Sequence, residues 1–226
     1  MVLTGSASKM AYYADAKSLG NRLRGRRARK FLDPLLENLH ARRGSISVVD
    51  LGGTELYWTR LGDRLERFNI SVTLVNMRPQ TVTHPRFTSI AGSATRTDFG
   101  DNTFDLVHSN STIEHVGQWP DMRDMAREVR RLAPVYYVQV PNFWFPVEPH
   151  FRSVFFHYLP EQIRARMLMR WRLGFHGPCP TLDDAMRHVQ SSKLLDSAQL
   201  RALFPDAKIM GERVFGLVKS LIAIRT

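Results

Sequence analysis

The sequence has little cysteine and no long apolar run. Cys179 is the single cysteine among 226 residues. One thiol excludes an internal disulfide framework and any metal site built from several thiolates. No apolar stretch approaches the length of a membrane span, and the first residues, "MVLTGSASKM", have no apolar core of a signal peptide. We therefore expect a cytoplasmic protein.

Acidic residues are also scarce relative to basic ones. Lys and Arg number 32 against 21 Asp and Glu, which gives a formal net charge of +11. Part of this excess is local, and the basic residues concerned are Arg22, Arg24, Arg26, Arg27, Arg29 and Lys30. Such a run is typical of a solvated helix face, but it also fits binding of an anionic partner such as nucleic acid, a phospholipid surface or a phosphorylated substrate. Both interpretations stay open at the level of sequence.

What the sequence does have is the composition of one folded domain. With 43% hydrophobic and 23% charged residues, the chain is expected to form a single domain over residues 1–226. Leucines and Phe31 recur at helical spacing near the start, which predicts an N-terminal helical segment over 1–43. Within it, Asp33 and Pro34 are placed to serve as the N-cap and first turn of a second helix.

Short apolar runs rich in β-branched residues then alternate with helical patterns. The predicted strands are 46–50, 70–75, 86–91, 104–109 and 135–140. The clearest helix between them is 120–132, and alternation of this kind predicts an α/β fold with a parallel sheet covered by helices on both faces. Near the C-terminus a helix starting at Asp196 or Ser197 precedes two strands joined so tightly that they must be antiparallel.

Residues 141–195 form an unusual insertion between the fifth and sixth strands. Its first part, "PNFWFPVEPHFRSVFFHYLP", combines aromatics, histidines and prolines without a clear period. The segment is either an ordinary packed connection or a lid over a substrate. Its position after the carboxyl end of a central strand, where open α/β sheets bind ligands, favours a lid.

The stretch "VVDLGG" places an acid and two glycines at the end of the first strand. Gly52 and Gly53 let backbone N–H groups approach a ligand closely. The G-x-G-x-x-G pattern of dinucleotide sites is absent, and Asp50 would repel a pyrophosphate. An acid at this position suits a ligand that carries positive charge, such as the sulfonium of S-adenosylmethionine.

With two further stretches of the sequence, this one resembles a known family. "VVDLGG", "VTLVNM" and "AGSATRTDFGDNTFDLVHSNSTIEHV" follow one another as in the class I S-adenosylmethionine-dependent methyltransferases, particularly those called methyltransferase family 11. The resemblance covers roughly 46–140 and implies a Rossmann-like open sheet of about seven strands, mostly parallel with an antiparallel C-terminal strand, and S-adenosylmethionine as cofactor.

The resemblance also assigns residues to the parts of the cofactor. They are Asp50, Gly52 and Gly53 around the methionine moiety, Asn76 at the ribose, Met77, Ser93 and Ala94 at the adenine, and Ser109 and Asn110 beside the sulfonium. Asn76 and Ser93 stand where most members have an acid. Because an amide or hydroxyl forms weaker contacts than a charged acceptor, the cofactor is expected to bind with modest affinity.

Methyl transfer to a hydroxyl needs a group that removes its proton. Glu114 and His115 in "STIEHV" follow the fourth strand, and His150 follows Glu148 in "EPH", so Glu114, His115 and His150 are the candidate catalytic residues. The alternative is that they cap or orient nearby segments. Their spacing matches no metal motif, and no metal site is predicted.

The motifs also narrow the acceptor. The residues after the fourth strand, "SNSTIEH", differ from those of enzymes that methylate amino groups of bases, and no cysteine lies there for cytosine C5 methylation. The aromatic insertion favours a small-molecule acceptor, and the prediction is O-methylation of a small molecule, sugar or natural-product scaffold. The alternatives are an RNA methyltransferase and a basic, nucleic-acid-binding relative without catalysis.

Overall fold

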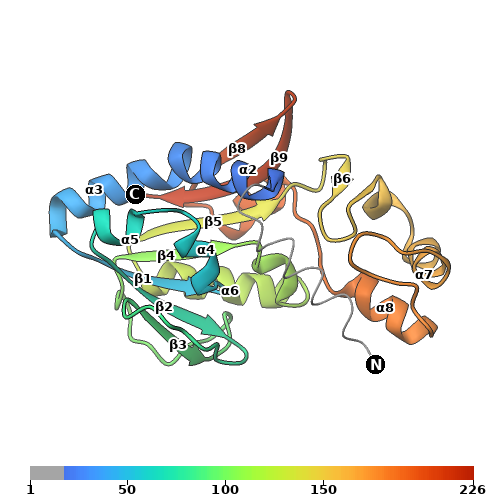
Figure 1. Cartoon of the computed structure of the whole chain (residues 1–226), viewed down its shortest axis with the longest axis horizontal. Helices are drawn as coiled ribbons and strands as arrows, with labels where there is room; N and C mark the ends of the chain where they lie inside the picture. Colours follow the sequence, from blue (N-terminus) through green and yellow to red (C-terminus); the bar gives the residue numbers. More distant parts are fainter. Residues whose placement is uncertain (1–17) are drawn as a thin grey trace.

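A seven-stranded sheet forms the centre of the molecule. The computed structural model describes residues 18–226, and its strands lie in the order β3-β2-β1-β4-β5-β9-β8 (Figure 1). Their bounds are β1 Ile46–Leu51, β2 Ile70–Asn76, β3 Phe87–Ala91, β4 Leu106–Asn110, β5 Val135–Pro141, β8 Lys208–Val214 and β9 Leu217–Arg225. The first five strands pair in parallel, and β9 runs antiparallel to both β5 and β8. The predicted fold class is confirmed.

Helices cover both faces of this sheet because its central strands are apolar on both sides. One face packs against α3 Asp33–Arg43, α4 Glu55–Thr59, α5 Arg64–Arg67 and the π-helical turn that precedes α3. Helix α2 Leu19–Arg27 comes before that turn. The other face packs against α6 Trp119–Leu132 and α9 Ser197–Leu203. Helix α6 begins with Pro120 in its first turn and a capping box between Gln118 and Asp121, so the helix predicted at 120–132 is confirmed.

The N-terminal helix differs from its prediction at Asp33. One π-helical turn, η1 Ala28–Leu32, joins α2 directly to α3, so no free helix start exists for Asp33 to cap. Its carboxylate instead accepts hydrogen bonds from Arg64, at 2.5 Å from Nε and 2.7 Å from an Nη. The prediction of a capping Asp33 was wrong because the helix continues through it. Residues 1–17 of the predicted helical segment lie outside the described residues.

Residues 141–195, called here the lid segment, form a small layer beside one end of the sheet (Figure 1). Its elements are β6 Val147–Glu148, β7 Ser153–Val154, the 3₁₀ turn η3 Phe156–Tyr158, α7 Glu161–Arg170 and α8 Leu182–Gln190. They share a core of their own, made of Phe151, Phe156, Ala165, Leu168, Cys179, Ala185 and Val189. Helix α7 was not predicted, because arginines and methionines surround its two buried residues and obscure the helical period.

Within residues 18–226, none of the helices has the length and apolar character needed to cross a bilayer.

Candidate functional site

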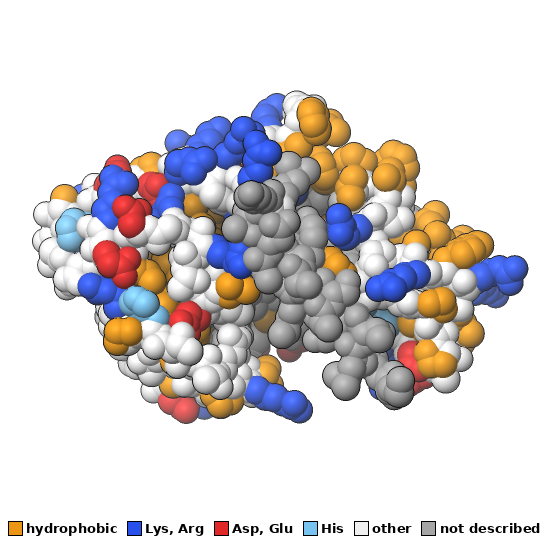
Figure 2. All heavy atoms as spheres, in the orientation of Figure 1, with side chains coloured by type: hydrophobic (Ala, Val, Ile, Leu, Met, Phe, Trp, Pro, Cys, Tyr) orange, Lys and Arg blue, Asp and Glu red, His pale blue; other side chains and the backbone are white. Residues whose placement is uncertain are grey.

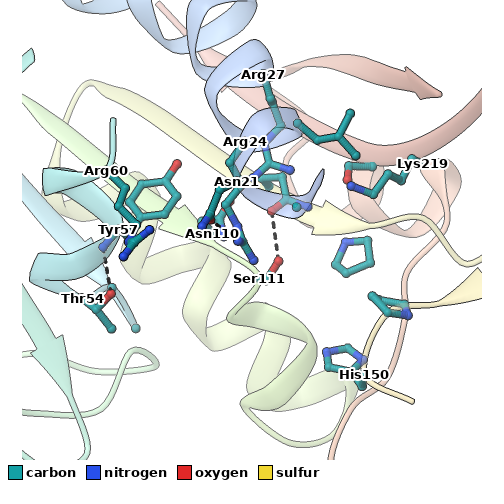
Figure 3. A pocket seen from close by; sticks show the side chains of 18 of the residues that line it. Asn21, Arg24, Arg27, Thr54, Tyr57, Arg60, Asn110, Ser111, His150 and Lys219 are labelled. Carbon is teal, nitrogen blue, oxygen red and sulfur yellow. Dashed lines mark hydrogen bonds between the residues drawn. The ribbon is translucent and has the colours of Figure 1, made fainter. Parts of the chain in front are cut away.

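A cavity of about 720 Å³ lies at the carboxyl ends of the central strands β1, β4 and β5 (Figure 3). Its walls come from the turn after β1, the end of β4, helix α2, the lid segment and β9. Of the predicted site residues, the cavity is lined by Asp50, Gly52, Gly53, Asn110 and His150. Its volume falls within the roughly 300–1,000 Å³ typical of small-molecule sites.

The glycine turn, Gly52 and Gly53, requires both glycines. Gly52 has φ +79°, and a Cβ added there would lie 2.4 Å from the side chain of Thr112. A Cβ on Gly53 would lie 1.8 Å from a carboxylate oxygen of Asp50. The backbone can pass this closely over Asp50 and beside Thr112 only without side chains of its own. Thr54 then starts α4, since its hydroxyl accepts a hydrogen bond from the Tyr57 N–H at 3.2 Å.

Asp50 lies beneath this turn and is 0% exposed. The indole N–H of Trp58 donates to one carboxylate oxygen at 2.8 Å. Nδ1 of His108, the residue that faces Asp50 across the parallel pair of β1 and β4, lies 2.9 Å from the other oxygen, although the angles are not those of a hydrogen bond. The far nitrogen of His108 lies 3.2 Å from the Tyr57 hydroxyl. Asp50 therefore supports the glycine turn from below as part of a buried polar network.

The end of β2 lies next to the glycine turn. Asn76, the last residue of that strand, donates from Nδ2 to the Gly53 carbonyl at 3.0 Å. Met77 follows it and is 79% exposed, so it lies open to solvent and not in the core. Both residues stand at the carboxyl edge of the sheet beside the cavity but outside its lining.

The residues after β3 and at the end of β4 have local partners. The Ser93 hydroxyl lies 2.7 Å from that of Thr95, and Ala94 packs against the main core. The Ser109 side chain is fully buried and donates to the Leu51 carbonyl at 3.0 Å. Ser109 thus joins β4 to β1 and does not face the cavity, whereas its neighbour Asn110 does.

Helix α2 forms a further wall of the cavity. Arg27 is buried, and its guanidinium donates to Glu212 at 3.1 Å and to the side chain of Asn110. Figure 3 shows Asn21, Arg24 and Arg27 reaching toward Asn110 from this helix. The basic run of the sequence therefore contributes to the cavity as well as to the surface.

The three candidate catalytic residues converge, although they come from separate segments. Glu114 and His115 lie in the 3₁₀ turn η2 Ile113–His115 after β4, and His150 lies in the loop between β6 and β7. The rings of His115 and His150 are 4.8 Å apart between centroids. Nδ1 of His150 lies 2.6 Å from Glu148, and Nδ1 of His115 lies 2.7 Å from the Ser191 carbonyl. We call Glu114, His115 and His150 the Glu–His cluster.

Glu114 is the unusual member of this cluster. Its side chain is 1% exposed, and neither carboxylate oxygen has a hydrogen-bond partner among the described residues. Burial raises the pKa of Glu114 to about 7, although its own backbone N–H and His150 oppose the rise, and nearby Glu148 adds to it. A carboxyl group with this pKa can hold or release a proton near neutral pH.

A comparison with known protein families identifies the class of enzyme to which this site belongs. A family model described as a methyltransferase domain matches residues 51–134, which run from the glycine turn through α6. The chain therefore contains a domain of the S-adenosylmethionine-dependent methyltransferases. A sequence comparison with curated proteins finds no match.

Solved structures resemble this methyltransferase at low identity. One from Rhodobacter sphaeroides, named for the Zn-dependent alcohol dehydrogenases, gives a TM-score of 0.50 at 14% identity over 80% of this chain and 85% of that one. The 1,6-didemethyltoxoflavin-N1-methyltransferase of Burkholderia thailandensis, with bound 1,6-didemethyltoxoflavin and S-adenosylhomocysteine, gives 0.49 at 15% identity over 85% and 76%. At 14% identity the first match shows a shared fold and nothing about activity.

The residues around the glycine turn of the methyltransferase fit its cofactor, S-adenosylmethionine. The turn leaves room that a Cβ on either glycine would fill, and it opens on a cavity large enough for a cofactor and a small acceptor. Asn76 lies beside the turn with a side-chain carbonyl that can accept from a ribose hydroxyl. This fit rests on backbone shape and not on a row of charged contacts.

Sequence reasoning missed several residues of the site. Trp58 and His108 complete the network around Asp50, and a histidine inside an apolar strand was the available signal for His108. Lys219 lines the cavity from β9, far away in the sequence, and no local pattern marked it. Arg27 was noticed only as one member of a basic run.

Proposed function

We propose that this methyltransferase methylates an oxygen atom of a small-molecule, sugar or natural-product acceptor. The observation that carries the proposal is the meeting of two features at one cavity. The glycine turn lines it on one side, and His150 of the Glu–His cluster lines it on the other. A site for the methyl donor and groups able to take a proton thus face the same space.

The chemistry requires positioning and removal of a proton. Bound S-adenosylmethionine supplies a methyl group activated by the sulfonium for in-line displacement. The glycine turn and Asn110 hold one side of the reaction space, so that the acceptor is directed at the methyl carbon from the His150 side. A neutral imidazole of the cluster takes the hydroxyl proton, and Glu148, 2.6 Å from His150, stabilises the imidazolium that forms.

The lid segment acts as a cover over the acceptor. Phe145, Val147, Pro149 and Phe175 line the cavity from this segment and contribute apolar surface. Apolar walls exclude water from the transfer step and leave a few polar groups to orient the acceptor. The lid segment is therefore the part of the chain that selects the acceptor.

The charge of the lining favours an acceptor that is itself negatively charged. The basic residues that line the cavity are Arg24, Arg27, Arg60, Arg152 and Lys219, while Asp50 is the single acidic residue among its described lining residues. Glu212 pairs with Arg27, and the cofactor, with a sulfonium and an ammonium against one carboxylate, adds a positive charge to the remainder. An acceptor with a carboxylate, phosphate or sulfate group neutralises this excess.

Lys219 tests this charge preference. Burial lowers the pKa of Lys219, and Arg27 and Arg24 add to that shift while Glu212 opposes it. Lys219→Ala is expected to raise KM for an anionic acceptor about tenfold, which corresponds to roughly 1.4 kcal/mol. KM for a neutral acceptor is expected to change little, and equal changes for both acceptors would refute an anionic substrate.

The proposed reaction is tested with a panel of hydroxylated acceptors. The purified protein is incubated with ¹³C-methyl-labelled cofactor and phenolic acids, sugar acids, sugar phosphates and their neutral and amino counterparts. Release of S-adenosylhomocysteine reports turnover, and the carbon chemical shift of the product identifies the methylated atom. Methylation of oxygen supports the proposal, whereas turnover confined to amino acceptors contradicts it.

A nucleic-acid substrate or ligand is the second candidate. Figure 2 shows Lys and Arg side chains gathered over helix α2, and the net charge is +11. Binding of RNA through this surface, with or without methyl transfer to it, would fall steeply as salt concentration rises. Weak binding with a flat salt dependence would remove this candidate.

A further inference from the structure

The Glu–His cluster has the composition and geometry of a site for a metal ion. One candidate ligand atom from each of Glu114, His115 and His150 lies within 4.8 Å of the others. Around a bound ion with ligand bonds of roughly 2.0–2.2 Å, neighbouring ligand atoms are about 3–4 Å apart. Small rotations of the side chains are enough to close that difference.

Both histidines are held in the orientation that metal-binding histidines adopt. The Nδ1–H of His115 donates to the Ser191 carbonyl at 2.7 Å, because a carbonyl can only accept. Nδ1 of His150 is held by Glu148 at 2.6 Å and lies 3.3 Å from the Ser192 hydroxyl. In the neutral ring the lone pair is then on Nε2. A carbonyl or carboxylate at the far nitrogen is the usual second layer around metal-bound histidine.

Glu114 gives an independent reason to expect a cation. Its carboxylate is almost fully buried, and neither oxygen has a hydrogen-bond partner among the described residues. Burial of a polar group without a partner is costly, and native structures usually provide one. A positive ion between Glu114 and the two histidine nitrogens supplies that partner.

We propose that Glu114, His115 and His150 bind one divalent transition-metal ion, with Zn²⁺ as the ion that suits them best. Two imidazole nitrogens and one carboxylate oxygen form a ligand set typical of catalytic zinc, whose fourth position stays open for water or substrate. His150 also lines the cavity, so an ion bound by it would lie at the edge of the space proposed for the acceptor.

The role of the ion in catalysis rests on the proposed O-methylation, whereas its binding does not. At the open position the acceptor hydroxyl binds as a ligand and loses its proton to solvent, since the ion increases its acidity. The oxygen then attacks the methyl carbon. The O–C bond forms as the C–S bond breaks, and the electron pair of that bond returns to sulfur and neutralises its charge. The ion thereby replaces a histidine as the agent that activates the hydroxyl.

Metal binding is tested directly on the full chain. The protein is stripped with a chelator, dialysed and titrated with Zn²⁺ by calorimetry and with Co²⁺ by visible absorption. One equivalent is expected, with a Co²⁺ spectrum of four- or five-coordinate N/O ligands. Absence of saturable binding, or a stoichiometry far above one equivalent, would overturn the proposal.

Variants assign the binding to these residues. Glu114→Gln and His150→Ala are expected to weaken Zn²⁺ binding at least about 100-fold, and Glu148→Gln roughly 10- to 100-fold, because Glu148 only orients His150. His84→Ala removes a histidine between β2 and β3, away from the cluster, and is the matched control. Circular dichroism confirms that each variant is folded. Unchanged affinity in Glu114→Gln would exclude that residue as a ligand.

Turnover separates the failure of this inference from that of the proposed function. The stripped protein is expected to lose O-methylation and to regain it with one equivalent of Zn²⁺. Full activity of the stripped protein would be consistent with the proposed O-methylation and would overturn the proposed role of the metal ion. Tight Zn²⁺ binding by a protein that methylates no hydroxyl would support the metal site and overturn the proposed function.

Discussion

Two buried carboxylates stand in neighbouring parts of the site, and their surroundings are opposite. Asp50 is the second-last residue of β1 and has the Trp58 indole and His108 as close partners. Glu114 follows β4 and has no hydrogen-bond partner among the described residues. Both are almost completely shielded from solvent. The difference teaches that burial alone does not define a role. Asp50 belongs to the support of the glycine turn, while Glu114 keeps a costly, unsatisfied carboxylate where function can use it.

Substitution of Asp50 is expected to have the largest effect. Asp50→Ala leaves the Trp58 N–H and His108 without their partner and removes the support beneath Gly53. We expect the free energy of unfolding to fall by about 3–5 kcal/mol and binding of S-adenosylhomocysteine to be lost. Asp50→Asn keeps one oxygen for Trp58 and is expected to retain part of both. Calorimetry and thermal melting measure the two quantities, and normal binding by a folded Asp50→Ala protein would contradict this role.

Removal of His115 is expected to separate chemistry from binding. His115 belongs to the Glu–His cluster but not to the lining of the cavity near the glycine turn. His115→Ala should lower kcat about 10²- to 10⁴-fold and leave the Kd of S-adenosylhomocysteine unchanged. His84→Ala, in the loop that connects β2 to β3, is the control for loss of a histidine. Unchanged turnover in His115→Ala would remove this residue from the reaction, and a parallel loss of cofactor binding would assign it a structural role.

Alanine substitutions at two glycines test whether the glycine turn contacts the cofactor. Gly52 and Gly216 have nearly the same backbone angle, φ +79° and +81°, but an added Cβ meets Thr112 at 2.4 Å in the first and nothing within 4 Å in the second. Gly216→Ala should cost only the roughly 1 kcal/mol of a left-handed alanine. Gly52→Ala should lower the free energy of unfolding by the same amount and further through the clash with Thr112. It should also weaken binding of S-adenosylhomocysteine at least about tenfold. Equal affinities in the two variants would show that the turn does not approach the cofactor.

The smallest expected effect is a gain in stability at Glu114. Burial raises the pKa of Glu114 to about 7 from an ordinary value near 4.5. The free energy of unfolding therefore begins to fall as the pH rises above about 4.5, and the full loss is reached above about 7, where the carboxylate is charged in the folded state as well. In chelator-treated protein at pH 8.5, Glu114→Gln should therefore raise the free energy of unfolding by about 1 kcal/mol, or Tm by roughly 2–4 °C. The gain should disappear near pH 4. A lower Tm at pH 8.5 would show that the carboxylate has partners after all.

The sequence predicted those parts of the molecule that local patterns specify. The strands that carry Asp50, Asn76 and Asn110 lie within two residues of their predicted ends, because apolar β-branched runs and turn residues mark them. The pattern failed where tertiary packing decides. Asp33 binds Arg64 in place of capping a helix, and α7 forms around a core that belongs to the lid segment alone.

The site was predictable as a set of residues but not as an arrangement. Glu114, His115 and His150 were recognised by residue type, yet their approach depends on how the lid segment folds back on η2. The contact between Asp50 and His108 depends on the register of β1 and β4, which no single motif encodes. For the same reason, the spacing of the Glu–His cluster gave no sign of a metal site.

A crystal structure with bound S-adenosylhomocysteine tests the central claim most directly. The account predicts the methionine end beside Gly52 and Gly53, the ribose near Asn76, and the thioether sulfur open toward Asn110 and His150. A compound bound outside this cavity, or bound with its adenine against the Glu–His cluster, would contradict the account.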